Sequence, residues 1–457
     1  MPQNPTLRRL APAALVLLAS LPAAAQTPQL SEDFKLTAPI PVEEAQFGYS
    51  VGVSGTTAIV GAPETFFTGN TQTFGFGAAY LIDTATGTRL AQIFSDDAAI
   101  FDEFGASVAI SGTTAIVGAP GANISPFIFG VDAGVAYLFD APTGTQTGRL
   151  TPSDGSDDDR FGRSVAISGT TAIVGSATDE AGFFSGSAYL FDISDPSNPV
   201  EIAKLTAPIP AAFDDFGVSV ATSDTVAIVG VPGDDQEGPD AGAAYLFDTA
   251  TGAQIARLTA NDAGASHAFG ASVAISGNNV LVRAAGDGSV YLFDISTPSQ
   301  PTQIAKLTAS GASTGEAFSS VAIAGTTAML GASDNAGAGS VYLFDISQPS
   351  NPVETAKLIA SDGAPGDLFG FSVALSGTTA IVGAFADDDA GIWTGSAYLF
   401  STERSIADLN NDGTLDFFDI SIFLTAFNNQ DPLADFNGDG LFDFFDVAAF
   451  IIAFGRG

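Results

Sequence analysis

The chain has 457 residues, no cysteine and a formal net charge of −37, with 46% hydrophobic and 14% charged residues. The absence of cysteine excludes disulfide bonds, so packing and strand pairing must hold the fold together. So acidic a surface repels nucleic acid and anionic membranes, while it favours solubility and the attraction of cations. A solvated surface suited to salty water is the simplest interpretation of this charge.

The first 25 residues have the features of a secretory signal peptide. Arg8-Arg9 precede an apolar run from Leu10 to Leu21, and Ala23-Ala24-Ala25 forms an A-x-A cleavage signal. The apolar run is shorter than the roughly 20 residues of a membrane helix. We therefore expect export and cleavage after Ala25, which makes the protein secreted or cell-surface associated. The Sec and twin-arginine routes both remain open, and no other segment is long and apolar enough to span a bilayer.

Residues 34–401 consist largely of seven copies of one unit. The stretch FGASVAISGTTAIVGAP and its variants begin at seven phenylalanines that are 49 to 57 residues apart: Phe47, Phe104, Phe161, Phe216, Phe269, Phe318 and Phe369. Each unit holds four short runs rich in β-branched and aromatic residues, which are typical of β-strands. Seven repeats of four strands predict an all-β fold, a seven-bladed β-propeller with four-stranded blades.

The ring is expected to close through an N-terminal strand. The seventh unit ends after three strands, at Phe400, and lacks the KLTA-like fourth strand that precedes the other units. An isolated copy of that strand lies at Phe34–Ala38, before the first unit. Pairing of this strand with the last blade would latch the ring and remove its open edges.

The units resemble the FG-GAP repeats of integrin-α-like propellers. The motif letters are Phe47-Gly48 with Gly61-Ala62-Pro63, and Phe104-Gly105 with Gly118-Ala119-Pro120. Later units match these letters less closely. The resemblance implies a propeller used for binding or adhesion, with an unknown protein or glycan as its ligand. Integrin blades also carry D-x-D-x-D-G calcium loops, which none of the seven units contains. Three acidic loops could still hold a cation or simply be solvated: Asp157–Asp159, Asp234-Asp235 and Asp387–Asp389.

The composition favours a protein that is not an enzyme. The only histidine is His267, and with no cysteine the usual nucleophile–base pairs are nearly excluded. Glycoside cleavage by a propeller would need paired carboxylates, which would appear as acidic residues at otherwise small positions in the first strands of particular units. The departures that occur are Arg283, Ser319 and Trp393, and none of them is acidic. Trp393 could stack on a sugar ring or pack locally.

After a linker at residues 402–407, residues 408–457 contain a duplicated acidic loop. The loop Asp408–Asp419 recurs 27 residues later as Asp435–Asp446. Oxygen ligands at positions 1, 3, 5, 9 and 12, glycine at 6 and a backbone carbonyl at 7 match the calcium loop of an EF-hand. The predicted ligands of two Ca²⁺ ions are Asp408, Asn410, Asp412, Thr414, Asp416 and Asp419, and Asp435, Asn437, Asp439, Leu441, Asp443 and Asp446.

Each acidic loop leads into a segment with an apolar stripe at helical spacing. The stripes are Ile420, Phe423, Leu424 and Phe427, and Val447, Phe450, Ile451 and Phe454. They predict two small α-helices that pack against each other. A segment this short has little core to offset its conformational entropy, so we expect it to fold only when Ca²⁺ binds.

Duplicated loop–helix units with Asp at position 12 resemble a dockerin domain, over about Asp408 to Phe454. The resemblance implies calcium-dependent binding to a cohesin-like partner, in which loop positions 10 and 11 contribute to recognition. Here those positions are Phe417-Phe418 and Phe444-Phe445. Polar residues are commoner there, and burial in the core of a tiny domain is the alternative for these phenylalanines.

Two functions remain open from the sequence. One is a secreted, non-catalytic propeller that binds protein or glycan and is tethered through the dockerin-like domain. The alternative is a divergent polysaccharide-degrading component of an extracellular complex, because dockerins often carry such enzymes. The lack of an acidic residue that breaks the repeat on a first strand favours the first function.

Overall fold

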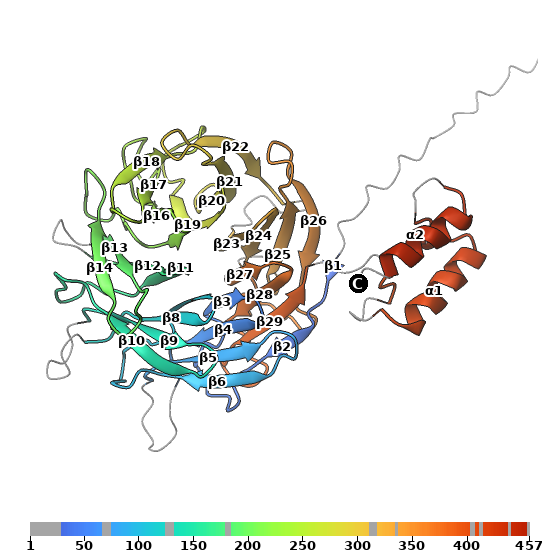
Figure 1. The fold of residues 1–457 in the computed structure, drawn as a ribbon, viewed down its shortest axis with the longest axis horizontal. Helices are drawn as coiled ribbons and strands as arrows, with labels where there is room; N and C mark the ends of the chain where they lie inside the picture. The colour runs from blue at the N-terminus through green and yellow to red at the C-terminus, as the bar shows by residue number, and fades with distance from the viewer. Residues whose placement is uncertain are drawn as a thin grey trace, which may run out of the picture.

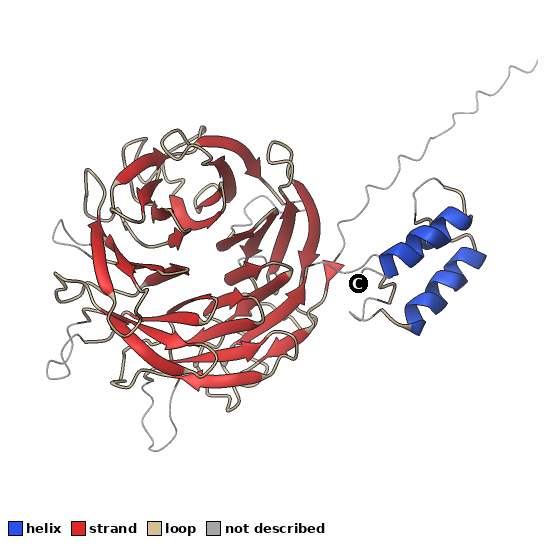
Figure 2. Cartoon of the chain, viewed as in Figure 1, coloured by secondary structure: helices blue, strands red, loops and turns tan. Residues whose placement is uncertain are grey.

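The computed structural model describes residues 29–65, 75–123, 132–178, 184–309, 318–333, 337–402, 407–410, 415–436 and 440–454. The signal peptide expected at residues 1–25 lies outside the described residues. The described strands form seven sheets arranged around one axis, as Figure 1 shows. Figure 2 shows that the ring contains only strands and loops, and that the helices belong to the C-terminal segment.

Five of the seven blades consist of four consecutive strands and nothing else. Blade 1 comprises β3 (Ser50–Ser54), β4 (Thr57–Ala62), β5 (Ala78–Asp83) and β6 (Arg89–Ile93). Blade 2 comprises β7 (Ser107–Ser111), β8 (Thr114–Ala119), β9 (Val135–Asp140) and β10 (Thr145–Leu150). Blade 3 comprises β11 (Ser164–Ser168), β12 (Thr171–Ser176), β13 (Ser187–Asp192) and β14 (Val200–Leu205). Blade 4 comprises β15 (Val220–Thr222), β16 (Val226–Val231), β17 (Ala243–Asp248) and β18 (Gln254–Leu258). Blade 5 comprises β19 (Phe269–Ser276), β20 (Asn279–Ala284), β21 (Ser289–Asp294) and β22 (Thr302–Leu307).

The last two blades also recruit the N-terminal segment. Blade 6 comprises β23 (Ser320–Ala324), β24 (Thr327–Ala332), β25 (Ser340–Asp345) and β26 (Val353–Leu358), with β1 (Gln29–Leu30) added in parallel along β26. Blade 7 comprises β27 (Ser372–Ser376), β28 (Thr379–Ala384) and β29 (Ser396–Ser401), with β2 (Phe34–Leu36) as its fourth strand. The prediction of seven four-stranded blades is confirmed. The fifth strand on blade 6 was not predicted.

The repeated phenylalanine anchors the core of each blade. Phe104 is fully buried, with its ring centroid 5.8 Å from those of both Tyr137 and Phe139 on the third strand. The other six repeat phenylalanines are at most 2% exposed, as are the tyrosines on all seven third strands. The middle strands are also apolar at consecutive positions, as in Ala115, Ile116 and Val117. Both faces of each sheet are therefore covered by neighbouring blades, as the sequence predicted.

A seam of glycine and serine joins each blade to the next. Between blades 2 and 3, the Ser107 hydroxyl donates to the carbonyl oxygen of Gly162 at 2.7 Å. A Cβ placed on Gly118 would lie 2.0 Å from that same oxygen, so the backbones can meet only at a residue without a side chain. Gly162 is the glycine of the FG letters of the repeat, and Gly118 is the glycine of the GAP letters. Equivalent hydroxyl–carbonyl bonds join Ser50 to Gly105, Ser164 to Gly217 and Ser372 to Gly48.

Two sets of contacts join the first and last blades. β2 pairs antiparallel with β29, with Lys35 opposite Tyr398. The seam bond from Ser372 to Gly48 connects blade 7 with blade 1 at 2.8 Å, as between the other blades. The structure therefore places the N-terminal strand where the sequence predicted it. That this strand keeps the ring closed stays a prediction.

The C-terminal segment forms α1 (Phe417–Asn428), the 3-10 helix η1 (Pro432–Ala434) and α2 (Phe444–Phe454). The rings of Phe423 and Phe450 stack with centroids 4.1 Å apart and an interplanar angle of 8°. The predicted stripe was wrong at two positions, because Leu424 and Ile451 are 57% and 62% exposed. Within the described part of the chain, neither α-helix is long and apolar enough to cross a membrane.

Replacing a seam glycine should destabilise the propeller through a steric clash alone. We expect Gly118→Ala to lower the free energy of unfolding by about 1–3 kcal/mol, as overpacking does. Gly112→Ala is the matched control: Gly112 has φ +56° and no atom within 4 Å of the position that an added methyl group would take, so only backbone strain of about 1 kcal/mol applies. Thermal melting of both variants measures the difference. Equal melting temperatures would contradict the seam argument.

Removing the N-terminal strand should open the ring. Deleting Phe34–Ala38 leaves the edge of β29 unpaired, so we expect a lower melting temperature or aggregation. A synthetic peptide spanning residues 31–38, added in excess, should restore part of the lost stability. Unchanged melting of the deletion variant would show that the pairing does not hold the ring closed.

Candidate functional site

The first acidic loop is folded around Asp419. This carboxylate is fully buried and accepts hydrogen bonds from the backbone N–H groups of Leu409 at 2.7 Å and Asp416 at 3.0 Å. Asp416 is the N-cap of α1, and its side chain accepts from the N–H of Phe418 at 2.7 Å. Together the two aspartates form a capping box that ties the start of the loop to the first turn of the helix.

The second acidic loop repeats this arrangement. Asp446 is fully buried and accepts from the N–H of Asp443 at 2.9 Å, while Asp443 accepts from Phe445 at 2.8 Å. Gly440 has φ +75° and donates its N–H to the Asp435 carboxylate at 2.9 Å. Glycine at loop position 6 therefore makes the sharp turn that the calcium-loop pattern requires.

The described residues of both loops offer the donor chemistry of a calcium site. They are carboxylate, amide and carbonyl oxygens, and Asp408 is only 7% exposed. A buried carboxylate held only by amides, as Asp419 is among its described partners, is stabilised by a nearby cation. Four predicted ligands lie outside the described residues: Asp412, Thr414, Asn437 and Asp439. Among the side chains that are described, no three acidic, His or Cys residues lie close enough to hold a metal ion.

The phenylalanines at loop positions 10 and 11 are not part of the core. Phe417 and Phe418 are 73% and 64% exposed, and their counterparts Phe444 and Phe445 are 74% and 65% exposed. The core lies instead at Phe423 and Phe450. The two helices thus present the same exposed aromatic pair at their N-terminal ends. We name these four side chains the phenylalanine patches.

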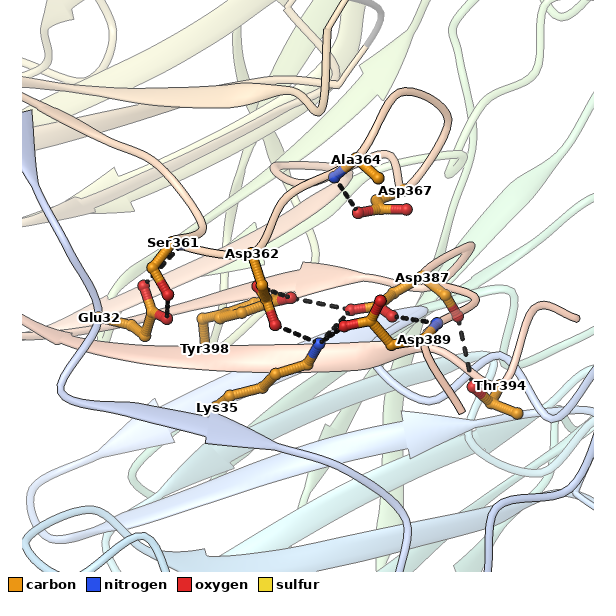
Figure 3. A network of polar contacts seen from close by, with 10 residues as sticks. All are labelled: Glu32, Lys35, Ser361, Asp362, Ala364, Asp367, Asp387, Asp389, Thr394 and Tyr398. Atoms are coloured by element: carbon orange, nitrogen blue, oxygen red, sulfur yellow. Dashed lines mark hydrogen bonds and ion pairs between the residues drawn. The ribbon is translucent and has the colours of Figure 1, made fainter. Parts of the chain in front are cut away.

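The acidic loop Asp387–Asp389 holds a lysine of the N-terminal strand (Figure 3). The Lys35 ammonium lies 2.6 Å from Asp362, 2.7 Å from Asp389 and 2.9 Å from Asp387. Burial acts to lower the pKa of Lys35, but its hydrogen bonds to the three carboxylates outweigh this and hold that pKa above its usual value. The Tyr398 hydroxyl donates to Asp387 at 2.8 Å, completing the group.

The same grouping recurs around the ring. In blade 3, Lys204 lies 2.6 Å from Asp154, which also accepts from the Tyr189 hydroxyl at 2.8 Å. Asp154 belongs to the segment after blade 2, so each such group joins two blades. Lys306 and Tyr291 repeat the pattern with Asp262 in blade 5. We call these groups the tyrosine–lysine–aspartate clamps. They were not predicted, although Tyr and Lys recur at fixed places in the third and fourth strands.

The other two acidic loops also engage protein partners. Asp234 accepts from Arg257 at 2.7 Å and from the Tyr245 hydroxyl at 2.8 Å; burial and this contact raise the pKa of Tyr245 to about 12. Asp159 is 7% exposed and accepts from the N–H of Ser156 at 2.7 Å. In each loop the buried carboxylate is therefore satisfied by the protein itself, as expected for structural loops.

One face of the propeller collects exposed apolar side chains. We define the upper face as the loops that lead into the first strands together with the loops between second and third strands. Backbone bonds join these loops, as from Gln46 to Trp393 and from Phe101 to Gly75, both at 3.0 Å. The main exposed apolar residues are Ile40, Ile100, Phe101, Ile209, Phe213, Ile392 and Trp393, between 50% and 69% exposed. In the described chain, the turns on the opposite face carry no exposed large apolar side chain, but Leu90, Val200 and Val353, at the start of the outer strands beside those turns, are 51% to 55% exposed.

The axis itself is lined by apolar residues. A cavity of about 260 Å³ is bounded by the first strands of all seven blades, including Val53, Ile110 and Leu375. Two of the departures from the repeat, Arg283 and Ser319, replace the GAP glycine of blade 5 and the FG glycine of blade 6, and the Ser319 hydroxyl donates to the carbonyl oxygen of Gly370, at the start of blade 7. His267 lies in an upper-face loop, with its Nδ1 3.9 Å from Asp287.

Comparison with protein families finds the same seven repeats, offset by one strand from the blades. The FG-GAP repeat matches seven segments, residues 30–82, 88–139, 145–191, 199–247, 253–293, 301–344 and 352–400. Each segment starts on an outer strand and ends on the third strand of the next blade. Residues 184–206 also match the LVIVD repeat. A search of curated proteins gave no match.

A buried carboxylate of the upper-face loops should make stability depend on pH. Asp102 is 2% exposed and accepts from the N–H of Ala99 at 2.7 Å; burial raises its pKa to about 6. Because the pKa is higher in the folded protein than in the unfolded chain, this group's stabilisation is complete below about pH 4 and is lost as the pH rises through 6.

We therefore expect Asp102→Asn to melt like the parent at pH 4 and about 2 °C higher at pH 7.5, since about 1 kcal/mol moves the melting temperature by that order. Asn can still accept from Ala99. Asp96→Asn, an exposed carboxylate of the same loop, controls for net charge. A shift that is the same at both pH values would contradict the assignment.

Proposed function

The chain belongs to the FG-GAP repeat family, and from this we propose that its propeller is a secreted binding or adhesion module without catalytic activity. A propeller built of such repeats suggests a binding role. The apolar lining of the axial cavity supports the absence of catalysis, since the first strands contribute aliphatic and small side chains there. The protein is exported by its N-terminal signal peptide, which is removed after Ala25.

The second half of the proposal concerns the C-terminal segment, which we propose to be a dockerin-like domain that binds a cohesin-like protein. The observation that carries it is the duplicated exposure of the phenylalanine patches. Phe417 and Phe444 are 73% and 74% exposed, at equivalent positions in two helices. Aromatic side chains so exposed cost free energy unless a partner covers them, and they are typical anchors of protein interfaces.

Calcium would control this interface through the acidic loops. Phe417 and Phe418 directly follow Asp416, which caps α1, and Asp419 ties the loop to the same turn. Two Ca²⁺ ions, held by the loops Asp408–Asp419 and Asp435–Asp446, would neutralise the clustered carboxylates. A cation that binds only the folded form adds about 2.7 kcal/mol at a hundredfold excess over Kd. The phenylalanine patches would then be presented only when calcium is bound.

The alternative function, a polysaccharide-degrading component, is favoured by the dockerin-like tail alone. It predicts release of reducing sugars by the full chain from a common polysaccharide. Such activity, abolished by a single change on a first strand, would replace the non-catalytic proposal.

Calcium titration of the full chain tests the proposed tail. We expect isothermal calorimetry to detect two high-affinity sites in the parent, and one in each of Asp412→Ala and Asp439→Ala, because each change removes a position-5 ligand. The double variant is the control for calcium bound by the propeller. Helical signal from the tail should fall in the double variant and in chelator.

Binding of two ions by the double variant, or none by the parent at millimolar Ca²⁺, would remove the calcium proposal. Binding to the docking partner is tested separately. Phe417→Ser with Phe444→Ser should abolish capture by an immobilised cohesin domain while leaving the calcium stoichiometry at two. Loss of both readouts would indicate a folding role for these phenylalanines.

A further inference from the structure

We propose that the N-terminal segment, residues 29–36, is an acid-sensitive latch: acid breaks the charged group around Lys35 and releases this segment while the other strands of the ring stay folded. The inference goes beyond the proposed function and does not depend on it. Three features carry it. They are the small apolar area that the latch buries, the charges that hold it, and its connection to the rest of the chain.

The latch has few contacts of the kind that hold the other strands. Of residues 29–36, only Leu30 and Leu36 are buried. β2 has three residues, whereas the fourth strands of the other six blades have five or six. β1 adds only two residues along β26. So short a segment gains little from burial or from strand pairing, so the polar contacts of its side chains decide whether it stays bound.

Carboxylates make these polar contacts, as Figure 3 shows. The Lys35 ammonium lies 2.6 to 2.9 Å from three of them, two in the loop Asp387–Asp389 of blade 7 and one, Asp362, in the segment after blade 6. The Glu32 carboxylate accepts from the backbone N–H and the hydroxyl of Ser361 at 3.1 and 2.6 Å. The latch is therefore joined to both blades by groups that titrate in acid.

The ion pair of Lys35 with Asp387 sets the direction of the pH dependence. Burial acts to raise the pKa of Asp387, but hydrogen bonds from Lys35 and Tyr398 outweigh it and hold that pKa below its usual value. Because the pKa is lower in the folded protein than in the unfolded chain, the stability from this pair is present above about pH 4. It is lost as the pH falls through the lowered pKa.

The other titratable groups around the pair keep this direction. Asp362 and Asp389 share the same lysine and also lose that contact when they are protonated. Burial and Asp387 raise the pKa of Tyr398, which therefore stays neutral in acid. Burial also raises the pKa of Asp367, with the negative charges of the Asp387–Asp389 loop adding to the effect, so Asp367 is protonated before Asp387 as the pH falls.

The connection along the chain separates the latch from the other clamps. The Lys204 clamp of blade 3 has the same geometry, with a 2.6 Å ion pair and the ammonium 5.6 Å from the tyrosine ring. However, β14 follows β13 through residues 193–199 and so stays attached to its own blade, whereas β2 leads through residues 37–49 to blade 1. Loss of the charges therefore leaves β14 in place and lets β2 leave blade 7.

Hydrogen exchange of the full chain, followed by mass spectrometry at pH 7 and pH 3, tests the latch. Rates are corrected for the intrinsic exchange at each pH. In the parent, we expect the protection of residues 29–36 to fall at least tenfold at pH 3, while that of β14 changes less than twofold, because the latch opens without unfolding the blades.

A matched pair of variants tests the role of the charge. Lys35→Met removes the ammonium and keeps an apolar side chain, so at pH 7 it should lower the protection of residues 29–36 at least tenfold. Acid should then restore part of it, because Asp387, only 3% exposed and without its lysine, is more stable when protonated. In the control, Lys204→Met, the protection of β14 should stay within twofold of the parent.

Four results would overturn the inference. They are a latch that stays protected at pH 3 in the parent, loss of the latch and β14 together at pH 3, equal loss of β14 in Lys204→Met, and a Lys35→Met latch that loses further protection in acid. The pH comparison of the parent needs no variant, so it decides the question even where Lys35→Met fails to fold.

Discussion

The close approach of two backbones is the constraint on which the propeller depends, and it recurs at every blade boundary except that between blades 5 and 6. A serine hydroxyl of one blade reaches the FG glycine carbonyl of the next, and the GAP glycine lies against the same oxygen. A side chain at either glycine would push neighbouring sheets apart. The glycines of the FG and GAP letters are therefore required by contacts between blades rather than within one blade. The phenylalanine of the FG letters packs in the core beside this contact.

A seam that recurs at most boundaries fixes the relative position of the blades, while the upper-face loops differ in sequence from blade to blade. The clamps reinforce the frame at the periphery, where Lys204 and Tyr189 of one blade share Asp154 from the segment before it. At blade 7 the lysine comes from the other end of the chain, as Lys35. A frame held at its inner and outer edges can support strained loops such as those of Phe101 and Phe213.

Sequence patterns predicted the features that repetition encodes. Seven copies of four strands predicted the blades, and the misplaced copy at Phe34–Ala38 predicted the partner of β29. Sequence patterns failed where neighbours in space determine which side chains are buried. The stripe rule placed Leu424 and Ile451 in the core, yet two helices of 12 and 11 residues can bury only the side chains on their shared face. The parallel pairing of β1 with β26 could not be predicted, because a strand of two residues is too short to show a sequence pattern.

The candidate sites also differ in how far they can be predicted from the sequence. The acidic loops at Asp408 and Asp435 carry a spacing that can be read directly, because their ligands are neighbours along the chain. The upper face cannot be read this way, because Ile100, Ile209 and Ile392 are far apart in sequence and ordinary in type. Left-handed backbone at Phe101 or Trp393 is likewise invisible without coordinates.

The distribution of positive charge bears on the proposed calcium binding. The sequence has 14 basic residues, and seven of those that the structure describes lie in ion pairs with carboxylates of the propeller, namely Lys35, Arg149, Arg160, Arg163, Lys204, Arg257 and Lys306. The protein thus uses much of its own positive charge to join blades. The carboxylates that remain at the surface need cations from outside. The acidic tail loops would take them as Ca²⁺, so the proposed calcium binding follows from this excess of negative charge.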